Sequence, residues 1–185
     1  TAVMETAAHE ALAGTNLSAA DLADMALLLG ASSFLFAGEA DYRLSLAATG
    51  KATMPPIPPP GQVALGLAER LGMKGPVLTL NTACSSSANA LLAAASLLRR
   101  GEARRALVLG VEGLSAGALT GFYSMMLLDP DGCRPFDAKR SGMQIGEAVG
   151  AVLLEAEDGE DHPGDSLLGG ANLCDTHHMT SASPD

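Results

Sequence analysis

A short apolar segment that leads directly into a long run of small residues constrains the fold of this 185-residue chain more than any other feature. Val77–Leu80 is largely apolar, and the stretch Ser85–Arg100 is small or apolar almost all round. A short apolar run predicts a buried strand, and a helix that is apolar on all sides is buried as well. We therefore expect a central helix that packs against a sheet.

The alternation of strand and helix continues along the chain. Apolar runs and helical periodicity predict further strands at Met25–Gly30, Ala106–Val111, Val149–Glu155 and Leu167–Leu173, and helices at Thr1–Ala13, Gly38–Ala48, Gln62–Leu71 and Ala116–Met125. Prolines make Met54–Pro60 an extended loop. This order predicts an α/β fold, with a mixed, mostly parallel sheet covered by helices on both faces. We find no internal repeat or boundary, so residues 1–185 are expected to form one domain.

Charge and cysteine content restrict the partners and the compartment. A net charge of −10 repels nucleic acid and anionic lipid, so neither is an expected partner. No apolar stretch is long enough for a membrane span. The three cysteines cannot all pair and have no CxxC spacing, which favours reduced thiols in a cytoplasmic protein.

Cys84 lies where the strand ends and the long helix begins. A sharp strand-to-helix turn lifts a side chain clear of the sheet, and the free amides of the helix favour the thiolate that attacks a thioester. The backbone N–H of Cys84 could also donate to an oxyanion. Taken alone, the position also suits a small, buried, unreactive cysteine.

Four segments carry a resemblance to a known family. They are Asn81–Ala88 (NTACSSSA), Val111–Gly113 (VEG), Arg134–Gly142 (RPFDAKRSG) with Gly146–Ala148, and Asp175–Thr180 (DTHHMT). In this order and spacing they resemble the β-ketoacyl synthases, the condensing enzymes of fatty-acid and polyketide synthesis. The resemblance implies a thiolase-like layered fold of which the chain holds only the N-terminal half.

The resemblance also implies an activity. Cys84 would accept an acyl group, and decarboxylation of malonyl-acyl carrier protein would yield a carbanion that attacks it to give a 3-oxoacyl product. The substrates would be carried on the phosphopantetheine of acyl carrier protein, with no cofactor or metal of the enzyme. The expected assembly is a homodimer or a ketosynthase heterodimer. Two alternatives stay open: a thiolase-like enzyme that uses CoA, and a non-catalytic partner subunit that shapes chain length.

Two features of the family are missing from the sequence. The family's "HGT" and "NHK"-like histidine motifs do not occur, and the four histidines present are His9, His162, His177 and His178. The resemblance gives His177 and His178 a supporting role at the channel entrance. The family's first strand is absent as well, so we expect a sheet that lacks a central strand.

Other residues are candidates for support or substrate contact. Arg140 and Glu147 are expected to form a buried ion pair behind Cys84, and Glu112 to pack or hydrogen-bond near it. By resemblance, substrate-binding residues are expected at Phe122, Met125, Met126 and Thr180.

Three further groups have weaker interpretations. Cys133 and Cys174 are expected to be structural. Cys174 could instead join His177 and His178 in a metal site. Four arginines, at positions Arg99, Arg100, Arg104 and Arg105, could attract an acidic carrier protein or interact with the helix dipole.

Overall fold

Four strands form one sheet in the order β2–β1–β3–β4 in a computed structural model that describes residues 2–32, 36–51, 53, 58–156, 165–178 and 183. The strands are β1 (Ala26–Ala31), β2 (Val77–Leu80), β3 (Arg105–Glu112) and β4 (Ala148–Glu155). β2, β1 and β3 run parallel, and β4 is antiparallel to β3. The mixed, mostly parallel sheet predicted from the sequence is confirmed.

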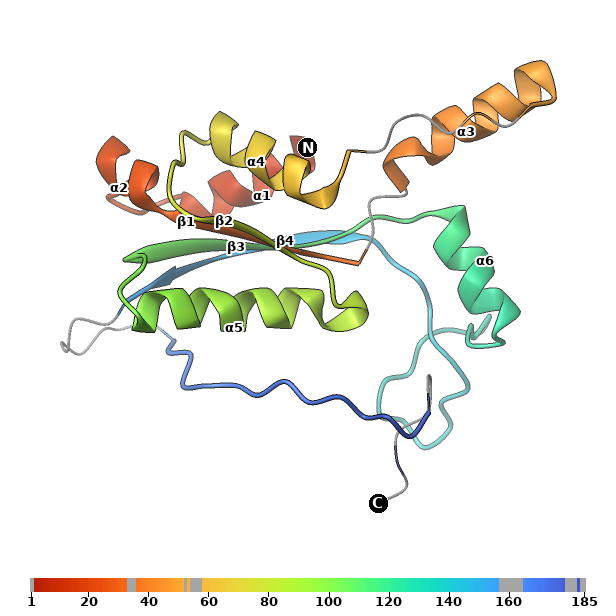
Figure 1. The fold of residues 1–185 in the computed structure, drawn as a ribbon. Coiled ribbons are helices and arrows are strands. Elements are labelled where there is room, and N and C mark those ends of the chain that lie inside the picture. The colour runs from red at the N-terminus through yellow and green to blue at the C-terminus, as the bar shows by residue number, and fades with distance from the viewer. Residues whose placement is uncertain are drawn as a thin grey trace.

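Helices surround this sheet, and some of those described cover its two faces. They are α1 (Ala2–Leu12), α2 (Ala19–Asp24), α3 (Phe36–Thr49), α4 (Pro60–Arg70), α5 (Ser86–Arg99) and α6 (Ala116–Ser124). Figure 1 shows α1, α2 and α4 on one face and α5 on the other, with α3 and α6 beyond one end of the sheet. Pro60 is the first residue of α4, a position where the missing N–H of proline is tolerated. Of the extended loop expected before it, residues 54–57 lie outside the described residues.

Alternation along β1 divides the core into two clusters. Leu27 and Leu29 face α1 and α4, whereas Ala26 and Leu28 face α5. All six residues of β1 are buried, as expected for a parallel strand covered on both sides. The helix α5 contributes Ala90, Ala94 and Leu97 to its cluster, and these small side chains let it approach the sheet closely.

The expectation of a missing central strand is wrong for the described sheet. β1 pairs with β2 on one side and with β3 on the other, and β3 pairs with β4, so no gap separates the strands. The backbone groups of the interior strands β1 and β3 therefore find partners within residues 1–185.

The strand expected at Leu167–Leu173 is also wrong. These residues have no regular structure, and the segment passes along α5 on the side away from the sheet (Figure 1, blue). A Cβ at Gly170 would lie 2.3 Å from a methyl carbon of Leu92 on α5, which places the segment against that helix. A strand needs a hydrogen-bonding edge, and α5 separates this segment from the sheet.

The sequence analysis missed the short helix α2. Ser18 and Asp21 form a capping box, since the amide of Asp21 donates to Ser18 Oγ (3.2 Å) and the amide of Ser18 donates to Asp21 Oδ2 (2.9 Å). Its six residues are too few to give a periodic signal, but the Ser-x-x-Asp spacing could have located its start. No helix among the described residues has the length and apolar content needed to cross a membrane.

Candidate active site

Cys84 lies in a tight turn between β2 and α5. The turn contains one short 3₁₀ helix, Ala83–Ser85, and α5 begins at the next residue. Ala83 has a φ of +52°, a left-handed conformation that destabilises a residue with a Cβ by about 1–2 kcal/mol. The thiol of Cys84 is exposed, so the buried alternative considered for this cysteine does not apply.

Serine hydroxyls hold this turn. The buried Ser86 accepts a hydrogen bond from the amide of Thr82 (2.9 Å) and donates to the carbonyl of Ala83 (2.6 Å). Ser85 Oγ donates to the carbonyl of Thr82 (2.8 Å). These bonds satisfy backbone groups on both sides of Ala83 and offset its strained conformation. Two of the three serines after Cys84 thus stabilise the turn.

Two glycines bring the first turn of α5 onto the sheet. Gly30 in β1 and Gly110 in β3 are register partners, and a Cβ on either would lie 2.5 Å from an atom of α5: the carbonyl oxygen of Ser86 or the hydroxyl of Ser87. Gly150 of β4 comes next in the same row, but a Cβ there would meet nothing within 4 Å. The helix therefore covers the first two glycines and leaves the third open.

A pocket of about 410 Å³ opens at Cys84 and extends over this uncovered part of the sheet. Small and apolar side chains form most of its lining, which consists of Ala31, Ser32, Ala83, Cys84, Ser86, Ser87, Leu91, Val108, Gly110, Val111, Glu112, Ala148, Gly150 and Val152. Glu112 accepts a hydrogen bond from the hydroxyl of Ser32 at its polar end. An exposed thiol beside an apolar pocket is an arrangement suited to the transfer of an acyl chain.

The ion pair expected between Arg140 and Glu147 is wrong. Arg140 donates to the carbonyl of Asp137 (3.0 Å), whereas Glu147 accepts from the amide of Leu114 (3.3 Å). Both side chains are exposed, so neither needs a charged partner to offset burial. Arg140 bonds within its own loop, whereas Glu147 bonds to the segment that joins β3 to α6, and their supporting role behind Cys84 stays a prediction.

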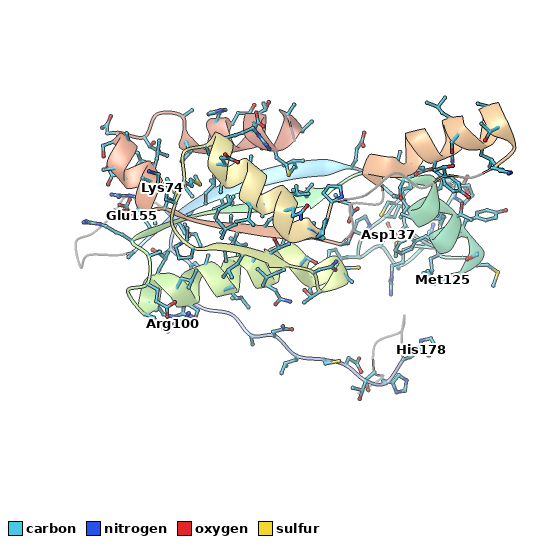
Figure 2. The ribbon with its side chains drawn as sticks, turned by 45° about the horizontal axis from the view of Figure 1, so that its top comes forward. Lys74, Arg100, Met125, Asp137, Glu155 and His178 are labelled. Carbon is cyan, nitrogen blue, oxygen red and sulfur yellow. The ribbon has the colours of Figure 1, made fainter. Side chains whose placement is uncertain are left out.

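The structure does not bring the expected substrate-binding residues to the Cys84 pocket. Phe122 lies on α6 and is half-buried, while Met125 and Met126 follow the helix with exposed fractions of 44% and 88%. None of the three lines the pocket, and Figure 2 shows Met125 at the outer end of α6. Thr180 and His162 lie outside the described residues.

His177 and His178 lie in the exposed segment that passes along α5. Figure 2 shows His178 well away from the sheet, and the amide of His177 donates to Asp175 Oδ1 (2.9 Å). That bond, followed by one from the amide of Ser183, holds the pKa of Asp175 below its ordinary value. The part of the chain that the structure describes contains no group of three or more potential ligands that could hold a metal, so Cys174, His177 and His178 do not assemble one.

The four arginines at and after the end of α5 lie at the opposite end of the helix from Cys84. Arg100 pairs with Glu102, and Arg105 bridges Asp21 (2.7 Å) and Glu155 (2.6 Å). Figure 2 shows Arg100 and Glu155 at this far end. Arg100 and Arg105 are therefore engaged within the chain, which weakens the interpretation of this cluster as a docking site beside the thiol.

Asp129 is a buried carboxylate that the sequence analysis did not single out. Its side chain is 2% exposed and accepts hydrogen bonds from the hydroxyl of Ser141, the amide of Asp131 (2.9 Å) and the guanidinium of Arg134 (3.2 Å). The Ser141 hydroxyl has the largest effect in holding the pKa of Asp129 below its ordinary value. Asp129 thus organises the long loop between α6 and β4.

Asn89 was missed as well. It lies one turn into α5, is 9% exposed, and donates from Nδ2 to Thr82 Oγ1 (2.7 Å) and to Ser85 Oγ (3.3 Å). A polar residue in an otherwise small and apolar helix face could have signalled a bonded position.

Known proteins match both the sequence and the fold. The family described as "Beta-ketoacyl synthase, N-terminal domain" matches residues 2–159. The chain is 36% identical over 130 residues to 3-oxoacyl-[acyl-carrier-protein] synthase I of Arabidopsis thaliana, covering 64% of this chain and 28% of that protein. It is 32% identical over 192 residues to nodulation protein E of Rhizobium meliloti, covering 95% of this chain and 46% of that one. The chain thus spans less than half the length of these relatives.

Solved ketosynthases share the architecture. The ketosynthase ApeO of Xenorhabdus doucetiae, in complex with its chain length factor ApeC, superposes with a TM-score of 0.63 at 30% identity, covering 83% of this chain and 39% of that chain. The ishigamide ketosynthase/chain length factor gives a TM-score of 0.70 at 26% identity, covering 80% and 39%. The strand–turn–helix geometry at Cys84, the sheet topology and the extent of the family match all agree, and the chain belongs to the β-ketoacyl synthase family.

Proposed function

We propose that this chain supplies the nucleophile of a condensing acyltransferase, with Cys84 as the acyl acceptor. The observation that carries the proposal is the exposed thiol of Cys84, which lies in a braced turn at the start of α5 and opens onto a mostly apolar pocket. Family membership supports a condensing role, because the relatives include a 3-oxoacyl-[acyl-carrier-protein] synthase.

In the first step the Cys84 sulfur attacks the carbonyl carbon of an acyl thioester. A carbon–sulfur bond forms to Cys84, the bond to the original thiol breaks, and that thiol leaves with the proton. The backbone N–H of Cys84 is the donor proposed for the developing oxyanion, and the N-terminal end of α5 beside it favours negative charge. The apolar pocket, which Gly150 and Val152 help to line, receives the acyl chain.

In the second step a malonyl thioester loses carbon dioxide. The carbanion that remains attacks the acyl carbon on Cys84, a carbon–carbon bond forms, and the Cys84 thiolate leaves. In the family, two histidines from "HGT" and "NHK"-like motifs promote the decarboxylation, and neither motif occurs within residues 1–185. We therefore assign to these residues the acyl-accepting step alone.

The proposed partners follow the relatives. The acyl groups would arrive as phosphopantetheine thioesters on acyl carrier protein, with no further cofactor. A homodimer, or a heterodimer with a chain length factor, is the proposed assembly, since two structural neighbours are a ketosynthase with its chain length factor. Three unpaired cysteines favour a cytoplasmic location.

Acylation of the protein tests the proposal. The full chain is incubated with an acyl-carrier-protein thioester, and the adduct is located by peptide mass spectrometry. We expect the acyl group on Cys84, with Cys133 and Cys174 unmodified as internal controls and no adduct in C84A. Transfer from acyl-CoA but not from the carrier thioester would favour the CoA-dependent alternative. A folded protein that takes the acyl group from neither donor would favour the non-catalytic partner subunit.

A further inference from the structure

Asn89 connects the helix α5 to the turn that carries Cys84. Its amide nitrogen donates to Thr82 Oγ1 (2.7 Å), on the strand side of the turn, and to Ser85 Oγ (3.3 Å), on the helix side. Cys84 lies between these two anchor points. No other described side chain bonds to hydroxyls on both sides of the cysteine.

The polar side chains of this cluster are joined by one connected set of hydrogen bonds. An asparagine amide has two N–H donors, and both are used, one on Thr82 and one on Ser85. The Ser85 hydroxyl lies within hydrogen-bonding distance of the carbonyl of Thr82 (2.8 Å) and of Thr82 Oγ1 (3.0 Å). Asn89 thus fixes the oxygen of Ser85 that in turn fixes the backbone of Thr82.

The backbone that Asn89 braces is the one under strain. Thr82 directly precedes Ala83, whose φ of +52° is unfavourable for a residue with a Cβ. Ser86 holds the amide of Thr82 and the carbonyl of Ala83, while Asn89 holds the side chains of Thr82 and Ser85. The two sets of bonds together keep the turn in the conformation that points Cys84 outward.

We propose that Asn89 is a positioning residue that sets the orientation of Cys84. It is buried and does not line the pocket, so it cannot touch an acyl group and acts only through the turn. The inference rests on the proposed function for its catalytic meaning, but the orientation of the thiol can be measured without any acyl transfer.

The test compares two reactions of Cys84 in N89A and in the unaltered full chain. One is single-turnover transfer from an acyl-carrier-protein thioester, and the other is alkylation by iodoacetamide followed at each cysteine by mass spectrometry. We expect the rate constant for acyl transfer to fall about 10- to 100-fold in N89A, because small displacements against a bound substrate have effects of this size. Alkylation, which needs only access to the sulfur, should slow by more than about two-fold. The thioester concentration that gives half the maximal rate should not change, since Asn89 lies outside the pocket.

Two further variants separate orientation from general damage. N89D keeps the shape of the side chain but has no N–H to donate, and we expect it to lose at least as much rate as N89A. A83G in the N89A background should recover part of the loss, because glycine adopts a positive φ freely and needs less bracing. A83G alone is measured beside it, so that the recovery is judged as a ratio.

S96A is the matched control on α5. Ser96 accepts a hydrogen bond from Arg100 far from the turn, and S96A should stay within about two-fold of the unaltered protein. Rates within two-fold for a folded N89A, or no recovery from A83G, would overturn the proposal. If unaltered Cys84 takes no acyl group, the proposed function fails, but the alkylation rates still decide the role of Asn89.

Discussion

The turn at Cys84 and the long loop between α6 and β4 are built in opposite ways. In the turn, hydroxyl groups hold the backbone on both sides of Ala83. Glycines in the sheet let the first turn of α5 pack closely against the strands. The loop is held by one buried carboxylate, Asp129, and by backbone hydrogen bonds of Met143 with Leu127 and Asp129, and it leaves Phe136 fully exposed. The turn is fixed by the sheet beneath it, and the loop by hydrogen bonds within the loop itself.

This difference explains which candidate residues meet. Cys84 and Glu112 come from chain segments that end at the same edge of the sheet, so both line one pocket. Met126 and Arg140 lie in the long loop between α6 and β4 and do not line that pocket. The sequence can therefore assign a side chain to the site only where a strand or a packed helix positions it.

The largest expected effect comes from adding a side chain where α5 contacts the sheet. Gly30→Ala would place a Cβ 2.5 Å from the backbone oxygen of Ser86, which cannot move without displacing the helix. We expect a loss of about 1–3 kcal/mol in the free energy of unfolding, or more, and slower alkylation of Cys84. Urea denaturation of the full chain measures the first quantity.

Gly150→Ala is the matched control in the same row of the sheet. Its added Cβ meets nothing within 4 Å, so the change in unfolding free energy should stay below about 0.5 kcal/mol. Equal losses in the two variants would mean that α5 does not press on Gly30, and the comparison between the covered and the open glycine would break.

The next effect concerns the carboxylate that organises the loop. The hydroxyl of Ser141, then the amide of Asp131 and the guanidinium of Arg134, hold the pKa of Asp129 below its ordinary value of 3.8. A group with a lowered pKa in the folded state stabilises the fold fully above its ordinary value, and this contribution is lost as the pH falls through the lowered pKa. Asn at this position does not titrate.

We therefore expect D129N to be less stable than the unaltered protein above pH 3.8, and the gap to narrow below it. Urea unfolding of both proteins across this range measures the gap. Asp21 and Asp175 also have lowered pKa values, but they are common to both proteins and cancel in the difference. A gap that does not change with pH would show that Asp129 does not act through its charge.

The sequence predicted the parts of the fold whose signal is local. The strands β1 to β4 are apolar runs, and the Cys84 turn joins a strand and a helix that are adjacent in the chain, so both could be located without tertiary information. Asp129 could not, because its importance depends on partners that irregular backbone brings to it. Asn89 left a signal, a polar residue in a small and apolar helix, but the sequence did not show which hydroxyls it would bond. The pairing of Arg140 with Glu147 failed for the same reason.

A smaller effect is expected at the cap of α2, which lies on the other side of the sheet from Cys84. Ser18 Oγ accepts from the amide of Asp21, and its hydrogen bonds are the main cause of the lowered pKa of Asp21. S18A should reduce the free energy of unfolding by about 1 kcal/mol, the usual effect of losing a helix N-cap. The alkylation rate of Cys84 should not change, because α2 shares no hydrogen bond with the turn; a slower rate would link the two regions.

The smallest effect concerns Arg140 and Glu147, the two exposed charges that the sequence placed together. Their hydrogen bonds go to different loops, to the carbonyl of Asp137 and to the amide of Leu114. A double-mutant cycle of R140M and E147Q should therefore give a coupling energy below about 0.5 kcal/mol.

A cycle between Arg105 and Glu155 provides the positive control, because these side chains are in contact at 2.6 Å and Arg105 is only 15% exposed. We expect a coupling of up to about 1 kcal/mol for that pair, measured by the same urea titrations. If Arg140 and Glu147 gave as large a value, the two charges would be in contact in solution. The loop would then be tied to the start of β4 by its charges as well as by Asp129, and the contrast with the turn at Cys84 would weaken.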